Sequence, residues 1–295
     1  MSTPAIENLI NYFIDIEITV IGPSSSIELL KKNPKVIKCV TIDSKNKILI
    51  RPFTELGFFD FYFTFRGSFR AMIIKLLINA ENKYQFNKSK FKNRHQVEKY
   101  VDFINDSLGI KYKAGNLICH IDKPEKKHDK RILGLNPGAS YGSAKRWYSQ
   151  KFAKIAIELS SSFDILIFGG NSELEFANSI ENYLIENKIH NFINLAGKTS
   201  ISELAKHISN LDIFITGDSG PMHIAASFKI PTVALFGPTN PVETSQWKNP
   251  YSIILKKNLD CQPCMKRNCP LNHHNCMKLI EADQVIDSIS KVIKI

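Results

Sequence analysis

The chain has 295 residues and a formal net charge of +11, and it is 43% hydrophobic and 23% charged. This composition excludes an intrinsically disordered chain, and no apolar run approaches the roughly 18 residues that a membrane-spanning helix needs. The N-terminus has no cationic stretch, and Glu7 and Asp15 interrupt its apolar residues. A secretory signal is therefore not expected, and the cytoplasm is the expected compartment.

The positive charge favours anionic partners: sugar nucleotides, phosphorylated glycolipids, nucleic acids or an anionic membrane surface. Solvated lysines in a sequence rich in Lys and Asn would give the same charge. No nucleic-acid recognition motif accompanies the charge, so a nucleic-acid partner is not expected.

The first half of the chain predicts an α/β domain that opens with a helix. Thr3 has the character of a helix N-cap with Pro4 at the first helical position, and apolar residues recur from Ile6 to Phe13 at helical spacing. Such a start is unusual, because an α/β domain ordinarily opens with a strand. Strands are predicted at residues 16–21, 36–42 and 59–65, and helices at residues 68–79 and 95–107.

From Arg131 onward, short apolar strands alternate with amphipathic helices. This alternation predicts parallel βαβ units, and hence a doubly wound sheet with helices on both faces. The polar stretch of residues 120–131 is the predicted linker, so we expect domains at residues 1–125 and 126–295 with a ligand cleft between them. The strands are predicted at residues 131–136, 164–169, 191–195, 212–217 and 232–237, and the helices at residues 149–160, 171–187, 200–210 and 221–228.

Two loops follow predicted strands in the second half, where open α/β sheets bind their ligands. In "GLNPGASYGSAKRW", glycines allow sharp turns and close backbone approach, and Lys145 and Arg146 place cations before a helix. The alternative is an ordinary Gly/Pro connection with solvated charges.

The second loop is "GDSGPMHIAASFKIPTVALFGPTNP". Asp218 ends a strand, Ser219 or Gly220 caps the next helix, and His223 lies in its first turn. The exposed N–H groups of a helix start suit a diphosphate, whereas Asp218 suits sugar hydroxyls. A plain strand–helix junction is the alternative. The G-x-G-x-x-G and P-loop signatures are absent from the sequence, which disfavours NAD dehydrogenases and P-loop enzymes.

Together with "IFGG", "NLAGKTSISELA" and "CPLNHHNCM", these two loops resemble the ADP-heptose–lipopolysaccharide heptosyltransferases of glycosyltransferase family 9, and fit the heptosyltransferase II branch best. The resemblance implies a GT-B fold of two Rossmann-like domains, an N-terminal one for the acceptor and a C-terminal one for the donor. It also implies inverting, metal-independent transfer of heptose from ADP-heptose to a Kdo-bearing lipid A acceptor at the cytoplasmic face of the inner membrane, to which the enzyme would associate peripherally.

The resemblance also implies roles for individual residues. Lys145 matches the lysine on the phosphate side of the donor. In "FRGSFRAMI", Arg66 and Arg70 would face the acidic acceptor, although two solvated arginines at a strand–helix turn are the alternative. The donor-binding set that the resemblance implies is Asn136, Gly138, Lys145, Asp218, Ser219, Gly220 and His223.

Four cysteines, Cys261, Cys264, Cys269 and Cys276, crowd into one stretch beside His273 and His274. Such spacing in a reducing compartment suits a zinc or iron–sulfur site. Since the resemblance implies turnover without a metal, we expect buried free thiols rather than a structural metal, and no catalytic metal or other cofactor.

The opening "MSTPAIENL" matches the start of the first helix in the family. There it follows a strand and a Gly-Asp loop that carries the proposed general base, so the N-terminal domain is expected to lack its first strand and this base. Asp60 and Glu55 are weak substitutes. Either the working enzyme is longer, or the chain is an inactive donor-binding relative; a family member that uses another nucleotide-sugar is a further alternative. The unpaired strand edges would favour aggregation.

Overall fold

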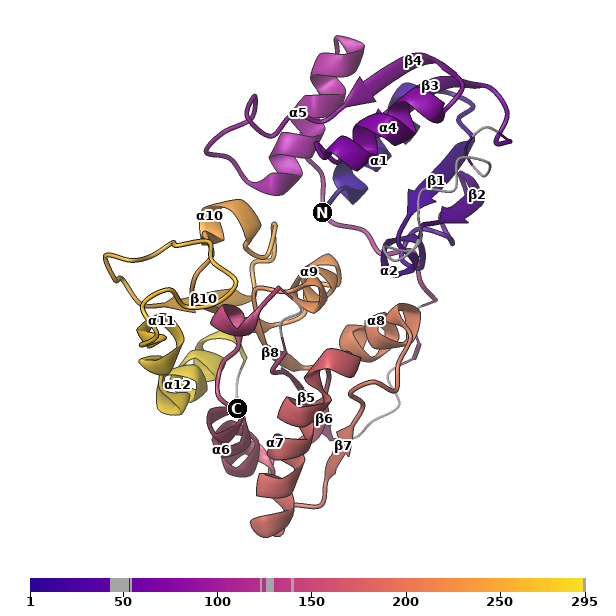
Figure 1. The fold of residues 1–295 in the computed structure, drawn as a ribbon. Coiled ribbons are helices and arrows are strands. Elements are labelled where there is room, and N and C mark those ends of the chain that lie inside the picture. The colour runs from indigo at the N-terminus through magenta and orange to yellow at the C-terminus, as the bar shows by residue number, and fades with distance from the viewer. Residues whose placement is uncertain (43–52, 54, 123, 126–129, 139–140, 294–295) are drawn as a thin grey trace. The chain divides into compact units, whose positions relative to one another are not determined.

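The computed structural model describes the chain except for residues 43–52, 54, 123, 126–129, 139–140 and 294–295 (Figure 1). Contacts between Cα atoms divide the chain into unit 1, Met1–Asn116, and unit 2, Leu117–Ile295. The domain boundary expected at residue 125 stays a prediction, since residues 126–129 lie outside the described part. No helix in the described residues is long and apolar enough to cross a membrane.

Unit 1 pairs its strands in two parallel ladders, β1 with β2 and β3 with β4. All strands and helices predicted for this half are confirmed, with ends that shift by at most two residues, but β4 and the short helix α2 were missed. The elements are α1 (Thr3–Tyr12), β1 (Ile18–Gly22), α2 (Ser24–Ile27), β2 (Val36–Thr41), β3 (Phe59–Thr64), α4 (Phe69–Leu77), β4 (Ala80–Gln85) and α5 (Gln96–Leu108).

The N-cap predicted at Thr3 is wrong by one residue. Ser2 occupies that position, so that Thr3 begins α1 and Pro4 follows in the first turn, where a missing N–H costs nothing. The expected absence of a first strand stays a prediction.

Adjacent residues of β3 bury opposite faces of its ladder. Phe63 packs with Leu9 of α1 and Phe103 of α5, in a cluster of stacked and edge-on aromatic rings. Tyr62 packs on the other side with Ile74 of α4. Helices therefore cover both faces of this ladder, as a parallel sheet requires.

Unit 2 is one six-stranded parallel sheet in the order β10-β9-β8-β5-β6-β7. Every predicted strand and helix of this half is confirmed, and β10, α12 and the short helices α10 and α11 were missed. The elements are β5 (Arg131–Asn136), α6 (Ser149–Leu159), β6 (Phe163–Ile167), α7 (Leu174–Glu186), β7 (Phe192–Asn194), α8 (Ile201–Ser209), β8 (Ile213–Gly217), α9 (Gly220–Ser227), β9 (Thr232–Phe236), α10 (Pro241–Thr244), β10 (Ser252–Lys256), α11 (Asn275–Lys278) and α12 (Ala282–Val292), with short 3-10 turns at η1 (Ser143–Lys145) and η2 (Asn171–Glu173).

The strand order of unit 2 reverses at β5, which lies between β6 and β8. Helices α6, α7 and α12 pack on one face of the sheet, through Phe152, Ala177 and Val285, while α8 packs beside α9 (Figure 1). Strands β8 and β9 are buried along their whole length. At such a reversal the connections leave in opposite directions and open a crevice beyond the carboxyl ends of β5 and β8.

Two isoleucines of the unit 2 sheet are expected to contribute very differently to the free energy of unfolding, because only one of them lies in the apolar interior. Ile215 in β8 is fully buried, whereas Ile193 in β7 is 57% exposed. We expect Ile215→Ala to lower the free energy of unfolding by about 2–5 kcal/mol, and Ile193→Ala to change it by less than about 0.5 kcal/mol. Urea titration followed by tryptophan fluorescence measures both, because Trp147 belongs to the same core cluster as Ile215. Equal losses in the two variants would contradict this account of the core.

Candidate functional site

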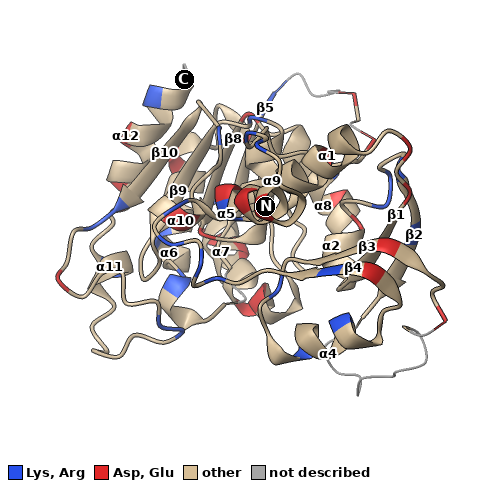
Figure 2. Ribbon diagram, turned by 90° about the horizontal axis from the view of Figure 1, so that it is seen from above, with Lys and Arg blue, Asp and Glu red and all other residues tan. Residues whose placement is uncertain are grey.

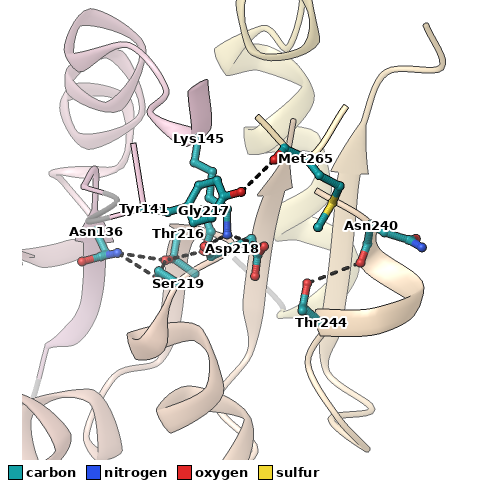
Figure 3. A network of polar contacts seen from close by, with 10 residues as sticks. All are labelled: Asn136, Tyr141, Lys145, Thr216, Gly217, Asp218, Ser219, Asn240, Thr244 and Met265. Carbon is teal, nitrogen blue, oxygen red and sulfur yellow. Dashed lines mark hydrogen bonds and ion pairs between the residues drawn. The ribbon is translucent and has the colours of Figure 1, made fainter. Parts of the chain in front are cut away.

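The reversal point of unit 2 brings together polar side chains from two strand ends. Asn136, the last residue of β5, is buried, and its Nδ2 donates hydrogen bonds to Thr216 Oγ1 at 3.1 Å and to Ser219 Oγ at 3.2 Å. Thr216 Oγ1 donates in turn to the carbonyl of Gly217 at 3.0 Å (Figure 3). This network fixes the backbone on either side of Asp218.

Lys145 and Asp218 form an ion pair in the same place. Lys145 Nζ lies 2.7 Å from Asp218 Oδ2 and 3.1 Å from the Asp218 carbonyl oxygen, and the two side chains are only 11% and 5% exposed. The ring of Tyr141 packs under the ammonium group, 4.7 Å from its centroid (Figure 3). A buried cation is therefore held just beyond the carboxyl end of β8, with the Asp218 carboxylate as its counterion.

Helix α9 begins directly beyond this pair. Ser219 is its N-cap and Gly220 its first residue, which decides between the two caps that the sequence left open. Within the described residues no side chain caps the helix, since the Ser219 hydroxyl bonds Asn136 instead. A Cβ at Gly220 would meet nothing within 4 Å, so the start of the helix is accessible. His223 is half-buried in the first turn. The backbone N–H groups at the start of α9 and the dipole of this helix suit an anion.

Gly138 packs against a buried carboxylate that the sequence analysis did not single out. A Cβ at Gly138 would lie 2.3 Å from Glu173 Cδ, so a larger residue there would displace the Glu173 side chain. Glu173 is 8% exposed, and its Oε2 accepts a hydrogen bond from the Gly170 N–H. Its only sequence signal is its place three residues after the strand-end glycine pair Gly169–Gly170.

The loop after β9 buries polar atoms without a protein partner. Thr239 and Gln246 are 4% and 6% exposed, and the Thr239 hydroxyl and both polar atoms of the Gln246 amide have no hydrogen-bond partner among the described residues. Such atoms are rare in native proteins and call for an explanation. The stretch "FGPTNP" at the end of β9 contains Thr239, but no residue of it was predicted to belong to the site.

The candidate acceptor arginines lie in unit 1, separately from the donor candidates. Arg66 lies in the connection from β3 to α4 and is exposed, whereas Arg70 lies in the first turn of α4 and is half-buried. Ser68 caps α4 by accepting a hydrogen bond from Ala71 N, and Gln85 Nε2 donates to the carbonyls of Arg66 and Ser68. The backbone that presents the two guanidinium groups is therefore fixed from both sides.

The four clustered cysteines are free thiols, three of them half-buried and Cys276 buried. Burial, together with the neighbouring thiols, raises the pKa of Cys276 to about 11, so this thiol stays protonated and unreactive at neutral pH. Among the described residues, no group of three or more His, Cys, Asp or Glu side chains is arranged to hold a metal ion.

Comparison with known proteins assigns the family. Residues 70–275 match glycosyltransferase family 9 (heptosyltransferase). The chain is 40% identical to the lipooligosaccharide heptosyltransferase 2 of Campylobacter jejuni subsp. jejuni serotype O:2, over 100% of this chain and 94% of that protein.

Solved structures agree on the fold. ADP-heptose lps heptosyltransferase II from E. coli superimposes with a TM-score of 0.81 at 19% identity, over 99% of this chain and 93% of that one. A family 9 glycosyltransferase from Veillonella parvula gives a TM-score of 0.79 at 21% identity, over 99% and 92%. The chain therefore belongs to glycosyltransferase family 9, the heptosyltransferases, and has their GT-B fold.

Proposed function

We propose that this glycosyltransferase transfers heptose from ADP-heptose to the inner core of a lipopolysaccharide or lipooligosaccharide. The full-length similarity to lipooligosaccharide heptosyltransferase 2 supports this substrate class. The Lys145–Asp218 pair at the start of α9 carries the proposal, because a buried cation beside free helix N–H groups is what a departing diphosphate needs.

In the proposed reaction, an acceptor hydroxyl oxygen attacks the anomeric carbon of the heptose. The bond from that carbon to the diphosphate breaks on the opposite face, ADP takes the electron pair, and the acceptor hydroxyl gives its proton to a base that we leave unassigned. The incoming diphosphate displaces Asp218 from Lys145, and the ammonium group neutralises the charge that develops on the diphosphate. Asp218, once released, accepts hydrogen bonds from sugar hydroxyls. This scheme gives Lys145 and the N-terminus of α9 the task that a metal ion has in other glycosyltransferases.

Arg66 and Arg70 are the proposed acceptor contacts. Their forked guanidinium groups match the carboxylates of Kdo and the phosphates of lipid A, which they can bind through two parallel hydrogen bonds. Arg66 lies two residues after β3 and Arg70 in the first turn of α4, on the segment that leaves the carboxyl end of this strand, where an α/β domain binds ligands.

The direct test is transfer itself. The purified chain is incubated, with and without a chelator, with ADP-heptose and either Kdo-lipid A or its monoheptosylated form, and mass spectrometry follows the acceptor. We expect the acceptor to gain one heptosyl residue in both conditions. Binding of ADP-heptose without transfer would identify an inactive relative, and transfer from a different nucleotide-sugar only would overturn the proposed donor.

Replacing Lys145 tests its proposed role. Lys145→Met keeps the length of the side chain but removes its charge, so we expect kcat to fall about 100- to 1,000-fold, as when an enzyme loses one group that stabilises transition-state charge. Lys154→Met is the matched control, because Lys154 is exposed on α6 and pairs with Asp283 at the surface. Steady-state kinetics with ADP-heptose measures both, and unchanged kcat in Lys145→Met, in a variant that melts cooperatively, would refute the role.

The acceptor's lipid anchor requires the enzyme to work at a membrane surface, and α4 has the character of a docking element. Its inner face buries Ala71 and Ile74. On its outer face Phe69 is 73% exposed, Leu76 70% and Met72 40%, at helical spacing i, i+3 and i+7. Exposed apolar residues grouped in this way indicate an interaction site.

The charges beside the exposed apolar ridge of Phe69, Met72 and Leu76 indicate what kind of partner α4 binds. Residues 61–80 include Arg66, Arg70 and Lys75 and no Asp or Glu, and Figure 2 shows basic residues on α4 and no acidic ones. An apolar ridge flanked by cations suits an anionic lipid surface, where each basic residue contributes about 1 kcal/mol. We propose that α4 docks on the cytoplasmic face of the inner membrane and presents Arg66 and Arg70 to the acceptor headgroup.

Vesicle binding tests the docking surface without donor or acceptor. We expect the enzyme to co-sediment with vesicles of phosphatidylglycerol and phosphatidylethanolamine but not with phosphatidylcholine alone, and we expect Phe69→Ser with Leu76→Ser to weaken binding tenfold or more, to about the level of the neutral vesicles. Ile185→Ser on α7, at a side chain that is 53% exposed, is the matched control. Equal binding by the α4 variant and the control would exclude α4 as the docking element.

A further inference from the structure

The cysteine-rich segment, residues 261–276, contacts the turn that carries Lys145. This turn, η1 (Ser143–Lys145), is one three-residue 3-10 turn, a structure too short to hold its shape alone. Its central residue bonds the segment through both backbone groups: Ala144 N donates to the Arg267 carbonyl at 2.9 Å, and the Ala144 carbonyl oxygen lies 2.9 Å from His274 Nε2.

Side chains extend this contact on both sides of the turn. The Tyr141 hydroxyl donates to the Met265 carbonyl at 2.8 Å, as Figure 3 shows, and the Ser143 hydroxyl lies 2.9 Å from Asn268 Oδ1. The backbones come so close that a Cβ at Gly142 would lie 2.3 Å from the Arg267 carbonyl oxygen. The turn therefore takes its position from a segment more than 120 residues away in the sequence.

The other side of the segment is fixed to the loop after β9. Met265 N donates to the Pro238 carbonyl at 2.8 Å, and Gln262 Nε2 donates to the Gly237 carbonyl at 2.6 Å. Since β9 pairs with β8, the segment ties the Lys145 turn to the strand that directly precedes Asp218. One connected framework of hydrogen bonds therefore holds both charges of the ion pair in position.

His274 is the side chain that joins the turn to this framework. Its Nε2 contacts the Ala144 carbonyl and its Nδ1 lies 3.2 Å from the Tyr148 hydroxyl, so a neutral ring with its proton on Nε2 satisfies both contacts. Tyr148 is the N-cap of α6, which follows the turn. His274 itself has φ of 52°, in the left-handed region that a non-glycine residue adopts only with support from its surroundings.

We propose that the cysteine-rich segment is a brace that positions Lys145 for the leaving diphosphate, and that His274 is the positioning residue through which it acts. This inference rests on the proposed role of Lys145. In this role the segment contributes to catalysis by positioning Lys145, and none of its thiols has to bind a metal or react.

Kinetics with ADP-heptose tests the brace. We expect His274→Ala to lower kcat/KM for the donor about 10- to 100-fold, the scale of a misplaced catalytic group, with the KM for the acceptor unchanged. His274→Gln keeps an N–H that can reach the Ala144 carbonyl and should restore most of the loss. The control is His273→Ala, because His273 is exposed and its Nδ1 accepts a hydrogen bond from the nearby Asn275 N–H; it should stay within about twofold of the wild type.

A double-mutant cycle separates positioning from mere stabilisation. If His274 acts through Lys145, His274→Ala should have less than about a twofold further effect in a chain that already carries Lys145→Met. Full additivity, in variants that are folded at the assay temperature, would overturn the brace and leave the role of Lys145 standing. Unimpaired Lys145→Met would overturn the proposed role of Lys145 and the brace with it.

Discussion

The site depends on two opposite charges held in a nearly dry place, Lys145 and Asp218. Removing an ion from water costs several kcal/mol even after relaxation, and a buried pair repays this only with good geometry and further hydrogen bonds. The structure meets both conditions, since the ammonium group contacts the carboxylate and a carbonyl of the same residue. The Asn136–Thr216–Ser219 network and the cysteine-rich segment are the parts of unit 2 that keep this geometry.

The sequence predicted unit 2 well because buried parallel strands are continuous apolar runs that alternate with amphipathic helices. Strand β4, "AENKYQ", was missed since four of its six residues are polar, and only its ladder with β3 identifies it as a strand. Strand β10, "SIILK", lies at the edge of its sheet, pairs on one side with β9, and has a run of three apolar residues, which is short for a strand signal. A cap has a sequence signal where a side chain makes the bond, as at Ser200, which forms a capping box with Glu203 three residues later.

The candidate site was predictable only where the chain is locally distinctive. Asp218, Ser219 and Gly220 form one strand–helix junction, and its sequence shows the turn, the cap and the charge together. Glu173 and Thr239 have no such signal, because burial and the lack of a partner are properties of packing. The contact of His274 with Ala144 joins positions 130 residues apart, which neither periodicity nor spacing indicates.

The ion pair has a consequence for how binding energy is used. Lys145 is paired with Asp218 in the structure, so in the proposed reaction an incoming diphosphate must displace Asp218, and part of the binding energy of the donor is spent on that exchange. The affinity for the donor is therefore lower than it would be if Lys145 had no partner. In return, the ion pair holds the ammonium group in one position, so that it does not sample many rotamers. Oriented charge that needs no reorganisation when the bond breaks stabilises the transition state more than the ground state. A carboxylate that weakens donor binding therefore favours a higher kcat, provided that the turn carrying Lys145 keeps its position when the ion pair with Asp218 breaks.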